Sequence, residues 1–281
     1  MLYLVATPIG NLGDFSYRAV ETLKLCDYIL CEDTRHSRSL LSHYGIDKPL
    51  KSYHKFNEAT REVNILEDLE NGLSIGLITD AGTPGISDPG ERLVQAAIDK
   101  GIVVTSIPGA CAAITAISLS GIPSGRFQFI GFLPKQPGEI NSLLQEISFY
   151  PGTTIAYESP HRLVKTLGKL NDMLPKRRIA VARELTKKFE EIQRGTAAEL
   201  LQHYTMHPPK GEIVLLLSGS CKEESPDWSN LTPEEHVAWV ENSYLVTRKE
   251  AIKMVAKERQ TNKRDLYNLL VKPKDTDQTT S

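Results

Sequence analysis

Short apolar runs alternate with amphipathic segments along most of the chain. Eight runs have the length and the β-branched composition of strands, at residues 2–6, 28–31, 74–79, 103–107, 127–131, 154–157, 179–182 and 213–217. Between them, segments such as 63–69, 93–98 and 163–167 place apolar residues at helical spacing. This alternation predicts an α/β protein whose sheets are mostly parallel and are covered by helices.

Turn-forming residues divide this pattern into regions. Residues 120–125 read SGIPSG, and a polar stretch that we interpret as a linker follows Leu217 and runs to Ser229. We therefore expect an N-terminal α/β domain over residues 1–120, a second α/β domain over residues 121–220, and a smaller unit over residues 229–275. A chain of 281 residues is long enough for two such cores and an appendage.

The last unit is predicted to be helical. Thr232 and Thr247 are each followed three residues later by a glutamate, which is the capping box of a helix start, and Pro233 suits a first helical position. Apolar residues recur at helical spacing on both sides of residues 261–262, at Ile252, Val255, Ala256, Leu266, Leu269 and Leu270. The pattern predicts three helices that end in a helix-turn-helix.

Charge is unevenly distributed along the chain. Residues 248–274 carry nine basic and three acidic side chains, a net charge of +6 in a chain whose total is −2. A basic segment on an otherwise acidic protein is typical of a nucleic-acid contact, and Arg248, Lys249, Lys253, Lys263 and Arg264 are our candidates for it. The alternative is a basic helical cap that only packs on the rest of the protein.

The sequence argues against a membrane, secreted or metal-binding protein. Its longest apolar runs are far too short to cross a bilayer, and no positively charged segment precedes the apolar run that follows Met1, so we expect a cytoplasmic location. The cysteines, at positions 26, 31, 111 and 221, have neither zinc-site nor disulfide spacing. His203 and His207 lack the glutamate of a zinc-protease helix, so we expect no metal.

Three loops rich in glycine and proline follow predicted strands of the first domain, at residues 7–14, 79–90 and 106–110. Ligands of open α/β sheets bind beyond the carboxyl ends of the strands, and glycine lets backbone approach a ligand closely. We therefore expect a cofactor site in these loops, although each loop alone could be a tight turn. The sequence contains neither the dinucleotide fingerprint nor a P-loop, so the cofactor loop is of another kind.

Two groups of charged residues also follow predicted strands. Glu32, Asp33 and Arg35 form the first group, and we weigh a site role for it against a helix start whose acids face the helix dipole. Glu158, His161 and Arg162 form the second, in which the cations suit a phosphate and the glutamate suits a hydroxyl. Another candidate contact with an unpaired base is the cation-and-aromatic stretch at 54–56, with His54 and Lys55.

Four motifs together carry a resemblance to a known family. They are VATPIGNLGD at residues 5–14, CEDTR at 31–35, DAGTPGISDPG at 80–90 and YESPHR at 157–162. In this order they closely resemble the small-subunit ribosomal RNA cytidine 2′-O-methyltransferases of the tetrapyrrole methylase superfamily. The match extends to about Leu217, and the basic tail resembles the helix-turn-helix that such RNA enzymes often carry.

The resemblance implies S-adenosylmethionine held in a cleft between two α/β domains, usually within a homodimer. It also implies that residues 82–84 replace the Gly-Asp-Pro loop of the wider superfamily, so that backbone groups make the contact. The cofactor-binding residues that we expect are Pro8, Asp80, Gly82, Thr83, Pro84, Gly85, Ile86, Pro108, Gly109, Ala112, Ala113 and Tyr157. The implied target is a cytidine in the decoding region of 16S ribosomal RNA, and the implied partner is the small ribosomal subunit.

Methyl transfer to a ribose hydroxyl needs a proton acceptor near that hydroxyl. Glu158 and Asp33 are our candidates for the acceptor, and Arg162 for a catalytic cation. Arg35, His54, Lys55 and His161 join the basic tail residues as candidate RNA contacts. Three alternatives remain open: a tetrapyrrole C-methyltransferase on the same fold, a relative that methylates a protein side chain, and a non-enzymatic regulator that binds nucleic acid.

Overall fold

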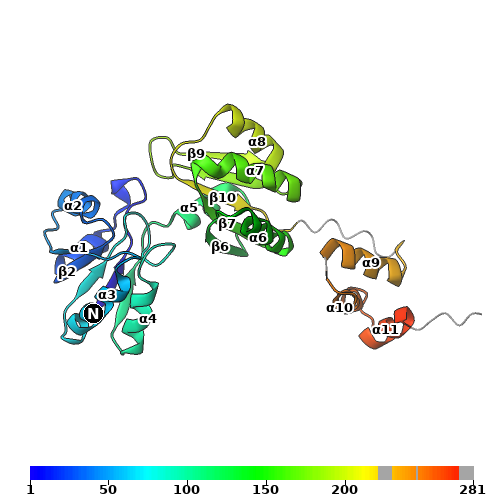
Figure 1. Ribbon diagram of the computed structural model, residues 1–281, viewed down its shortest axis with the longest axis horizontal. Coiled ribbons are helices and arrows are strands. Elements are labelled where there is room, and N and C mark those ends of the chain that lie inside the picture. The colour runs from blue at the N-terminus through cyan, green and yellow to red at the C-terminus, as the bar shows by residue number, and fades with distance from the viewer. Residues whose placement is uncertain (221–229, 245, 272–281) are drawn as a thin grey trace, which may run out of the picture. The chain divides into compact units, whose positions relative to one another are not determined.

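The first five strands form one sheet in the order β3-β2-β4-β1-β5, and all four neighbouring pairs are parallel (Figure 1). They span Leu2–Val5 (β1), Tyr28–Cys31 (β2), Leu50–Ser52 (β3), Ile75–Leu77 (β4) and Val104–Ile107 (β5). The central strands β2 and β4 are fully buried, as expected for a parallel sheet with both faces covered. The structure, a computed structural model, describes residues 1–220, 230–244 and 246–271.

Helices cover both faces of this sheet. They are α1 (Tyr17–Leu25), α2 (Thr34–His43), α3 (Glu58–Glu70) and α4 (Glu91–Asp99), with a short 3-10 helix at Leu12–Asp14. One face packs Leu66, Leu69 and Leu93 of α3 and α4 on the sheet, and the other packs Leu23 of α1 and Leu41 of α2. The apolar spacing at 63–69 and 93–98 therefore predicts α3 and α4 correctly.

The second sheet has the order β6-β7-β10-β8-β9. Its strands are Phe127–Phe132 (β6), Thr153–Glu158 (β7), Ile179–Arg183 (β8), Glu191–Gly195 (β9) and Ile213–Leu217 (β10). Only β6 and β7 pair in parallel, and the other three pairs are antiparallel. The expectation of mostly parallel sheets is therefore wrong here: β7 and β8 run in the same direction, but β10 lies between them and runs the opposite way.

Four helices accompany the second sheet: α5 (Ala112–Ser120), α6 (Pro137–Phe149), α7 (Pro160–Met173) and α8 (Ala197–Met206). Leu144 of α6, Leu167 of α7 and Leu200 of α8 pack on one face of this sheet. Ala116 and Ile117 of α5 pack on the other face, together with Ile9 of the first loop. This second core joins the two sheets inside a single compact unit, Met1–Ser220. The division of these residues at position 120 stays a prediction.

The remaining helices belong to a second unit, Cys221–Ser281. They are α9 (Pro233–Tyr244), α10 (Arg248–Glu258) and α11 (Lys263–Val271), and both predicted capping boxes are present at Thr232 and Thr247. Five of the predicted apolar positions in α10 and α11 pack in the core of this unit: Ile252, Val255, Ala256 and Leu266 are buried, and Leu270 is partly buried. Leu269 is 66% exposed because α11 turns Leu266 and Leu270 to the core instead. Residues 221–229 of the predicted linker, with Cys221, and residues 272–275 lie outside the described residues.

Candidate functional site

A cavity of about 370 Å³, which we call the central pocket, lies where the loops of the first sheet meet the second sheet. It is lined by residues 80–83 and 86–88 of the loop after β4, residue 9 of the first loop and residues 111–112 at the start of α5. The other wall is formed by residues 132, 157–160 and 211–214. The carboxyl ends of parallel strands are where open α/β sheets bind ligands, so this pocket is the candidate site.

The loop after β4 is held in a conformation that ordinary residues rarely adopt. Gly82, Gly85 and Gly90 have φ angles of +89°, +81° and +131°, and Ser87, which is not a glycine, has a φ of +66°. A Cβ at Gly90 would lie 2.8 Å from Leu77. Glycine adopts such angles freely, but at Ser87 the conformation is strained, and strain of this kind persists only where the surroundings impose it, often at functional sites.

An aromatic wall closes the pocket on the side of the second sheet. The ring of Tyr157 lies between Phe129 and Phe132, at centroid distances of 4.9 and 5.3 Å, in edge-to-face geometry. Phe132 reaches this place because the pairing of β6 with β7 shifts register near Gly131, whose φ is +68°. Burial raises the pKa of the Tyr157 phenol to about 12, so the wall is uncharged near neutral pH.

The structure brings together half of the residues that we expected to bind the cofactor. Those that line the central pocket are Asp80, Gly82, Thr83, Ile86, Ala112 and Tyr157. The other six do not line it. Ala113 and Pro84 are buried, the former in the core around α5, whereas Pro108 and Gly109 are exposed. Pro8 and Gly85 line neighbouring hollows. Gly109 still needs to be small, because a Cβ there would lie 2.8 Å from that of Ala6.

Three carboxylates gather near this pocket. Glu32 follows β2, whereas Asp80 and Asp88 belong to the loop after β4. Burial, and then the charge of Asp80, raises the pKa of Glu32. Burial, and then the charge of Glu32, raises the pKa of Asp88 to about 6, although Lys55 acts in the opposite direction. Asp88 therefore exchanges its proton closer to neutral pH than an exposed aspartate does.

Glu158 lines the pocket, but its carboxylate is already hydrogen-bonded to neighbouring residues. Its Oε1 accepts a 2.7 Å hydrogen bond from the amide of Ser159 and lies 3.3 Å from Nε of Arg162, and its Oε2 accepts a 2.6 Å bond from Thr166. The guanidinium of Arg162 also donates to the carbonyls of Leu133 and Pro134. This network ties the start of α7 to the end of β7.

Asp33 caps the start of α2. The charged group that follows β2 is thus a helix start, which is one of the two interpretations of its sequence. The Asp33 carboxylate accepts a 2.8 Å bond from the amide of Arg35 and pairs with the guanidinium of the same residue at 3.0 Å. The bond from the Arg35 side chain lowers the pKa of Asp33 to about 2. The amide of Asp33 lies 3.4 Å from Oδ1 of Asp80, which joins the end of β2 to the loop after β4.

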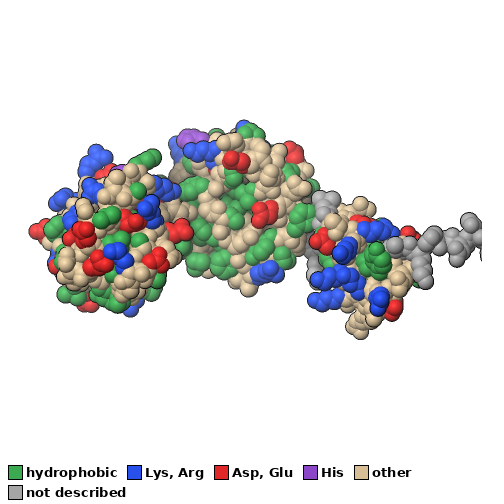
Figure 2. All heavy atoms as spheres, turned by 60° about the horizontal axis from the view of Figure 1, so that its bottom comes forward, with side chains coloured by type: hydrophobic (Ala, Val, Ile, Leu, Met, Phe, Trp, Pro, Cys, Tyr) green, Lys and Arg blue, Asp and Glu red, His purple; other side chains and the backbone are tan. Residues whose placement is uncertain are grey.

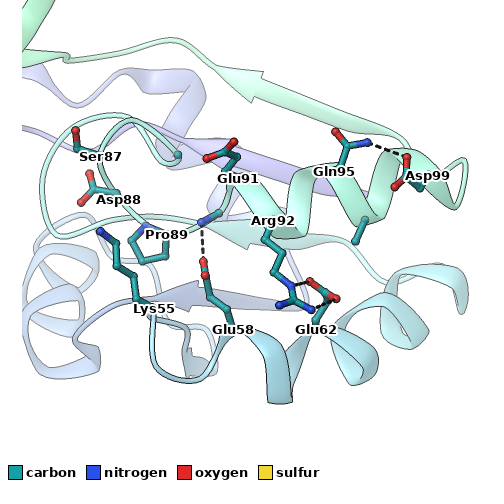
Figure 3. Close-up of a pocket in the computed structure, with 13 residues that line it drawn as sticks. Lys55, Glu58, Glu62, Ser87, Asp88, Pro89, Glu91, Arg92, Gln95 and Asp99 are labelled. Atoms are coloured by element: carbon teal, nitrogen blue, oxygen red, sulfur yellow. Dashed lines mark hydrogen bonds and ion pairs between the residues drawn. The ribbon is translucent and has the colours of Figure 1, made fainter. Parts of the chain in front are cut away.

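Two hollows adjoin the central pocket. The first, which we call the α3–α4 hollow, measures about 680 Å³ and is lined by Lys55, Ser87 and Asp88 together with residues of α3 and α4 (Figure 3). The second, the α2 hollow, measures about 650 Å³ and includes His36, His43 and Lys187. Each shares lining residues with the central pocket: Ser87 and Asp88 in the first case, and Ile9, residues 80–81 and Glu212 in the second.

The expected RNA contacts occupy exposed positions, with one exception. Arg35, Lys55 and His161 are exposed, whereas His54 is half-buried beside Asn57. Next to them, Phe56 is 96% exposed, so the cation-and-aromatic stretch is open to solvent. In the C-terminal unit the candidate residues Arg248, Lys249, Lys253, Lys263 and Arg264 are all exposed. Figure 2 shows lysine and arginine side chains gathered on one face of this unit.

Reasoning from the sequence did not select several residues that line the pocket. Ser87 and Asp88 lie inside a motif that we quoted, and the proline and glycine around them were a usable signal. Phe132 and residues 211–214 come from the second sheet, and no local pattern links them to the first-domain loops.

Two features are absent from the part of the chain that the structure describes. Within residues 1–220, 230–244 and 246–271, no helix combines the length and apolar character needed to cross a bilayer. The same residues contain no group of three or more His, Cys, Asp or Glu side chains arranged to hold a metal ion.

Comparison with known proteins identifies related chains. Residues 1–201 match the sequence profile of the tetrapyrrole (corrin/porphyrin) methylases. A protein of Halalkalibacterium halodurans named ribosomal RNA small subunit methyltransferase I is 46% identical, over 95% of this chain and 93% of its own. A Synechocystis protein of the same name is 44% identical, over 96% of each chain. The crystal structure of diphthine synthase has a similar fold, with a TM-score of 0.59, 13% identity, and coverage of 78% and 90%.

Proposed function

Because the chain belongs to the tetrapyrrole (corrin/porphyrin) methylase family, we propose that it methylates small-subunit ribosomal RNA, using S-adenosylmethionine as the donor. The proposed acceptor is the ribose 2′-OH of a cytidine in the decoding region of 16S RNA. The observation that carries the proposal is the 46% identity, over 95% of the chain, to a protein named ribosomal RNA small subunit methyltransferase I.

The central pocket fits the proposed donor in size and chemistry. Ligand pockets of drug-sized molecules begin at about 300 Å³, and this one measures about 370 Å³. Gly82 lines the pocket with backbone alone, which lets a ligand approach closely, and Tyr157 provides a flat surface for a base. When bound, S-adenosylmethionine would supply a methyl group activated by a positively charged sulfur.

The remaining residues would bind and orient the RNA. The exposed cations of the C-terminal unit suit phosphate contacts, which fix the position of a nucleic acid without reading its sequence. Phe56, exposed beside Lys55, suits stacking on an unpaired base. We also propose the homodimer that the family resemblance implies, which a mass measurement in solution tests.

The test is methyl transfer from labelled S-adenosylmethionine to small ribosomal subunits from cells that lack this activity. A methylated 2′-OH cannot take part in alkaline cleavage of the next phosphodiester bond. Label on the ribose therefore survives alkali in a dinucleotide that contains cytidine, whereas label on a base appears in a mononucleotide. We expect the dinucleotide.

Parallel reactions separate the alternatives. Transfer to a porphyrinogen but not to RNA would support the tetrapyrrole C-methyltransferase, and label in ribosomal protein would support methylation of a side chain. Binding of nucleic acid without transfer to any of the three would support the regulator. Each of these results would contradict the proposal.

A further inference from the structure

Three neighbouring strands of the first sheet are each followed by charged side chains at their carboxyl ends. The strands β3, β2 and β4 are adjacent and parallel, so their carboxyl ends meet. Lys55 follows β3, Glu32 follows β2, and Asp80 and Asp88 follow β4. The fold thus collects three acids and one cation beside the central pocket, from three separate segments between residues 32 and 88.

Asp88 occupies a particular place in this group. It lines both the central pocket and the α3–α4 hollow, so it borders the two spaces where a donor and an approaching acceptor would meet. Figure 3 shows its carboxylate on the same side of the hollow as the ammonium of Lys55, away from the Arg92–Glu62 ion pair. A group in this position can reach an atom that reacts in the central pocket.

The carboxylate of Asp88 has no hydrogen-bonding partner among the described residues, although the backbone beside it is constrained. Within the described parts of the chain, it makes neither a hydrogen bond nor an ion pair, although it is half-buried. The backbone on each side is constrained: Ser87 has a φ of +66°, and the amide of Gly90 donates a 3.1 Å bond to Glu58. A partly desolvated acceptor without a partner favours a ligand that brings a donor.

The other carboxylates near the pocket are already engaged. Both oxygens of Glu158 accept bonds from Ser159 and Thr166. Asp33 pairs with Arg35, and Oδ1 of Asp80 accepts a 3.4 Å bond from the amide of Asp33. Glu212 also lines the pocket, and its carboxylate pairs with Lys187 at 2.9 Å. Glu32 does not line the pocket. Asp88 is therefore the carboxylate best placed to accept a proton from a ligand.

We propose that Asp88 is the catalytic base, which accepts the proton of the ribose hydroxyl. The inference rests on the proposed function. In the step, the O–H bond breaks and the proton passes to the Asp88 carboxylate. The hydroxyl oxygen forms a bond to the methyl carbon, and the electron pair of the C–S bond goes to the sulfur. The proton then leaves to water.

The charges around Asp88 suit this role. Burial and Glu32 raise its pKa to about 6, with Asp80 acting in the same direction and Lys55 in the opposite one. Tyr157 faces the group from β7 and is neutral near pH 7, and His54 acts on Glu32. A general base is most effective when its pKa lies near the working pH. Asp88 is thus ionised at pH 7, yet more basic than an exposed aspartate.

The first experiment compares Asp88→Asn with wild type in single-turnover methyl transfer at saturating RNA and donor. We expect the rate to fall about a hundredfold, with donor affinity by calorimetry changed less than threefold, on the order of 0.6 kcal/mol. Asp47→Asn is the matched control and should keep its rate, because Asp47 is exposed and precedes β3, at the amino ends of the strands. The proposal would be overturned if Asp88→Asn kept the wild-type rate, or if its donor affinity fell by as large a factor as its rate.

The second experiment follows the pH dependence. The wild-type rate should rise with pH and level off above an inflection near the Asp88 pKa of about 6. Lys55→Met should move this inflection to higher pH and Glu32→Gln to lower pH, because Lys55 stabilises the Asp88 anion and Glu32 opposes it. If Asp88 were only structural, its replacement would leave the pH dependence of the rate unchanged. An inflection that persists in Asp88→Asn would therefore contradict the proposal.

A third measurement does not depend on turnover. The carboxyl carbon of Asp88, followed by NMR in the free protein, should titrate with a midpoint near its pKa of about 6. A midpoint near that of an exposed aspartate, about 4, would overturn the assignment. Failure of the proposed function and failure of this inference give different results. If the proposed function is wrong, the wild-type protein transfers no methyl group to RNA. If only the inference is wrong, the wild type is active and Asp88→Asn is equally active.

Discussion

Thr7 and Gly82 exchange two backbone hydrogen bonds. The amide of Thr7 donates to the carbonyl of Gly82 at 2.9 Å, and the amide of Gly82 donates to the carbonyl of Thr7 at 3.1 Å. This pair joins the loop after β1 to the loop after β4 at the floor of the central pocket. Gly82 has a φ of +89°, so the contact depends on a residue that adopts this conformation without strain.

Gly82→Leu should abolish donor binding, because the side chain would enter the central pocket and the backbone would be strained. The matched control is Gly72→Leu: its φ of +90° is almost the same, nothing lies within 4 Å of its Cβ, and it does not line the pocket. Both variants should lose about 1–3 kcal/mol of stability, but only Gly82→Leu should lose affinity in calorimetry. Unchanged affinity in a folded Gly82→Leu protein would exclude this placement of the donor.

Replacing Lys249, Lys253, Lys263 and Arg264 together by Gln should weaken RNA binding and reduce its salt dependence. The slope of log affinity against log salt should fall by about one unit for each RNA phosphate that the variant no longer neutralises. Arg248 is left in place because it pairs with Glu241 at 3.1 Å.

Two controls accompany this variant: helix content by circular dichroism and donor affinity should both match wild type. If RNA binding keeps the wild-type salt slope, the C-terminal unit is a structural cap.

Glu158→Gln distinguishes two hypotheses about the proton acceptor. If Glu158 were the base, as the sequence suggested, the methyl-transfer rate would fall about a hundredfold. Because both of its oxygens accept hydrogen bonds and Arg162 lies 3.3 Å away, we expect a lower free energy of unfolding instead, by about 1–3 kcal/mol, with the rate retained. Glu67→Gln, on the exposed side of α3, should change neither quantity. A slow but fully stable Glu158→Gln enzyme would assign the chemistry to Glu158.

Asp88→Asn should make the free protein more stable at pH 8 but not at pH 3. The folded pKa of Asp88 is about 6 and the unfolded value is 3.8, so folding binds a proton between these values and stability falls as pH rises through 6. At pH 8 the wild type holds a partly buried charge that the variant lacks, and at pH 3 both side chains are neutral. Thermal melts at the two pH values measure the difference. Equal melting temperatures at pH 8 would show that burial of Asp88 has no energetic cost.

Local patterns were sufficient to predict most elements. The eight predicted strands and the helices at α3, α4 and α7 depend on apolar periodicity, and the starts of α9 and α10 depend on capping residues that interact within one turn. The prediction missed β3 and β9. β3 is only three residues long, and β9 contains a single apolar residue, Ile192, because it lies at the edge of its sheet.

The sequence by itself determined the type of elements, the family motifs and the loops in which the pocket lies. It could not determine that β10 would lie between β7 and β8, because pairing of distant strands leaves no local period. Nor could it show that Glu158 is enclosed by Thr166 while Asp88 is left without a partner, since a side chain's partners depend on which segments fold against it. Only the tertiary structure decided which of the carboxylates that line the pocket are engaged by other residues and which is not.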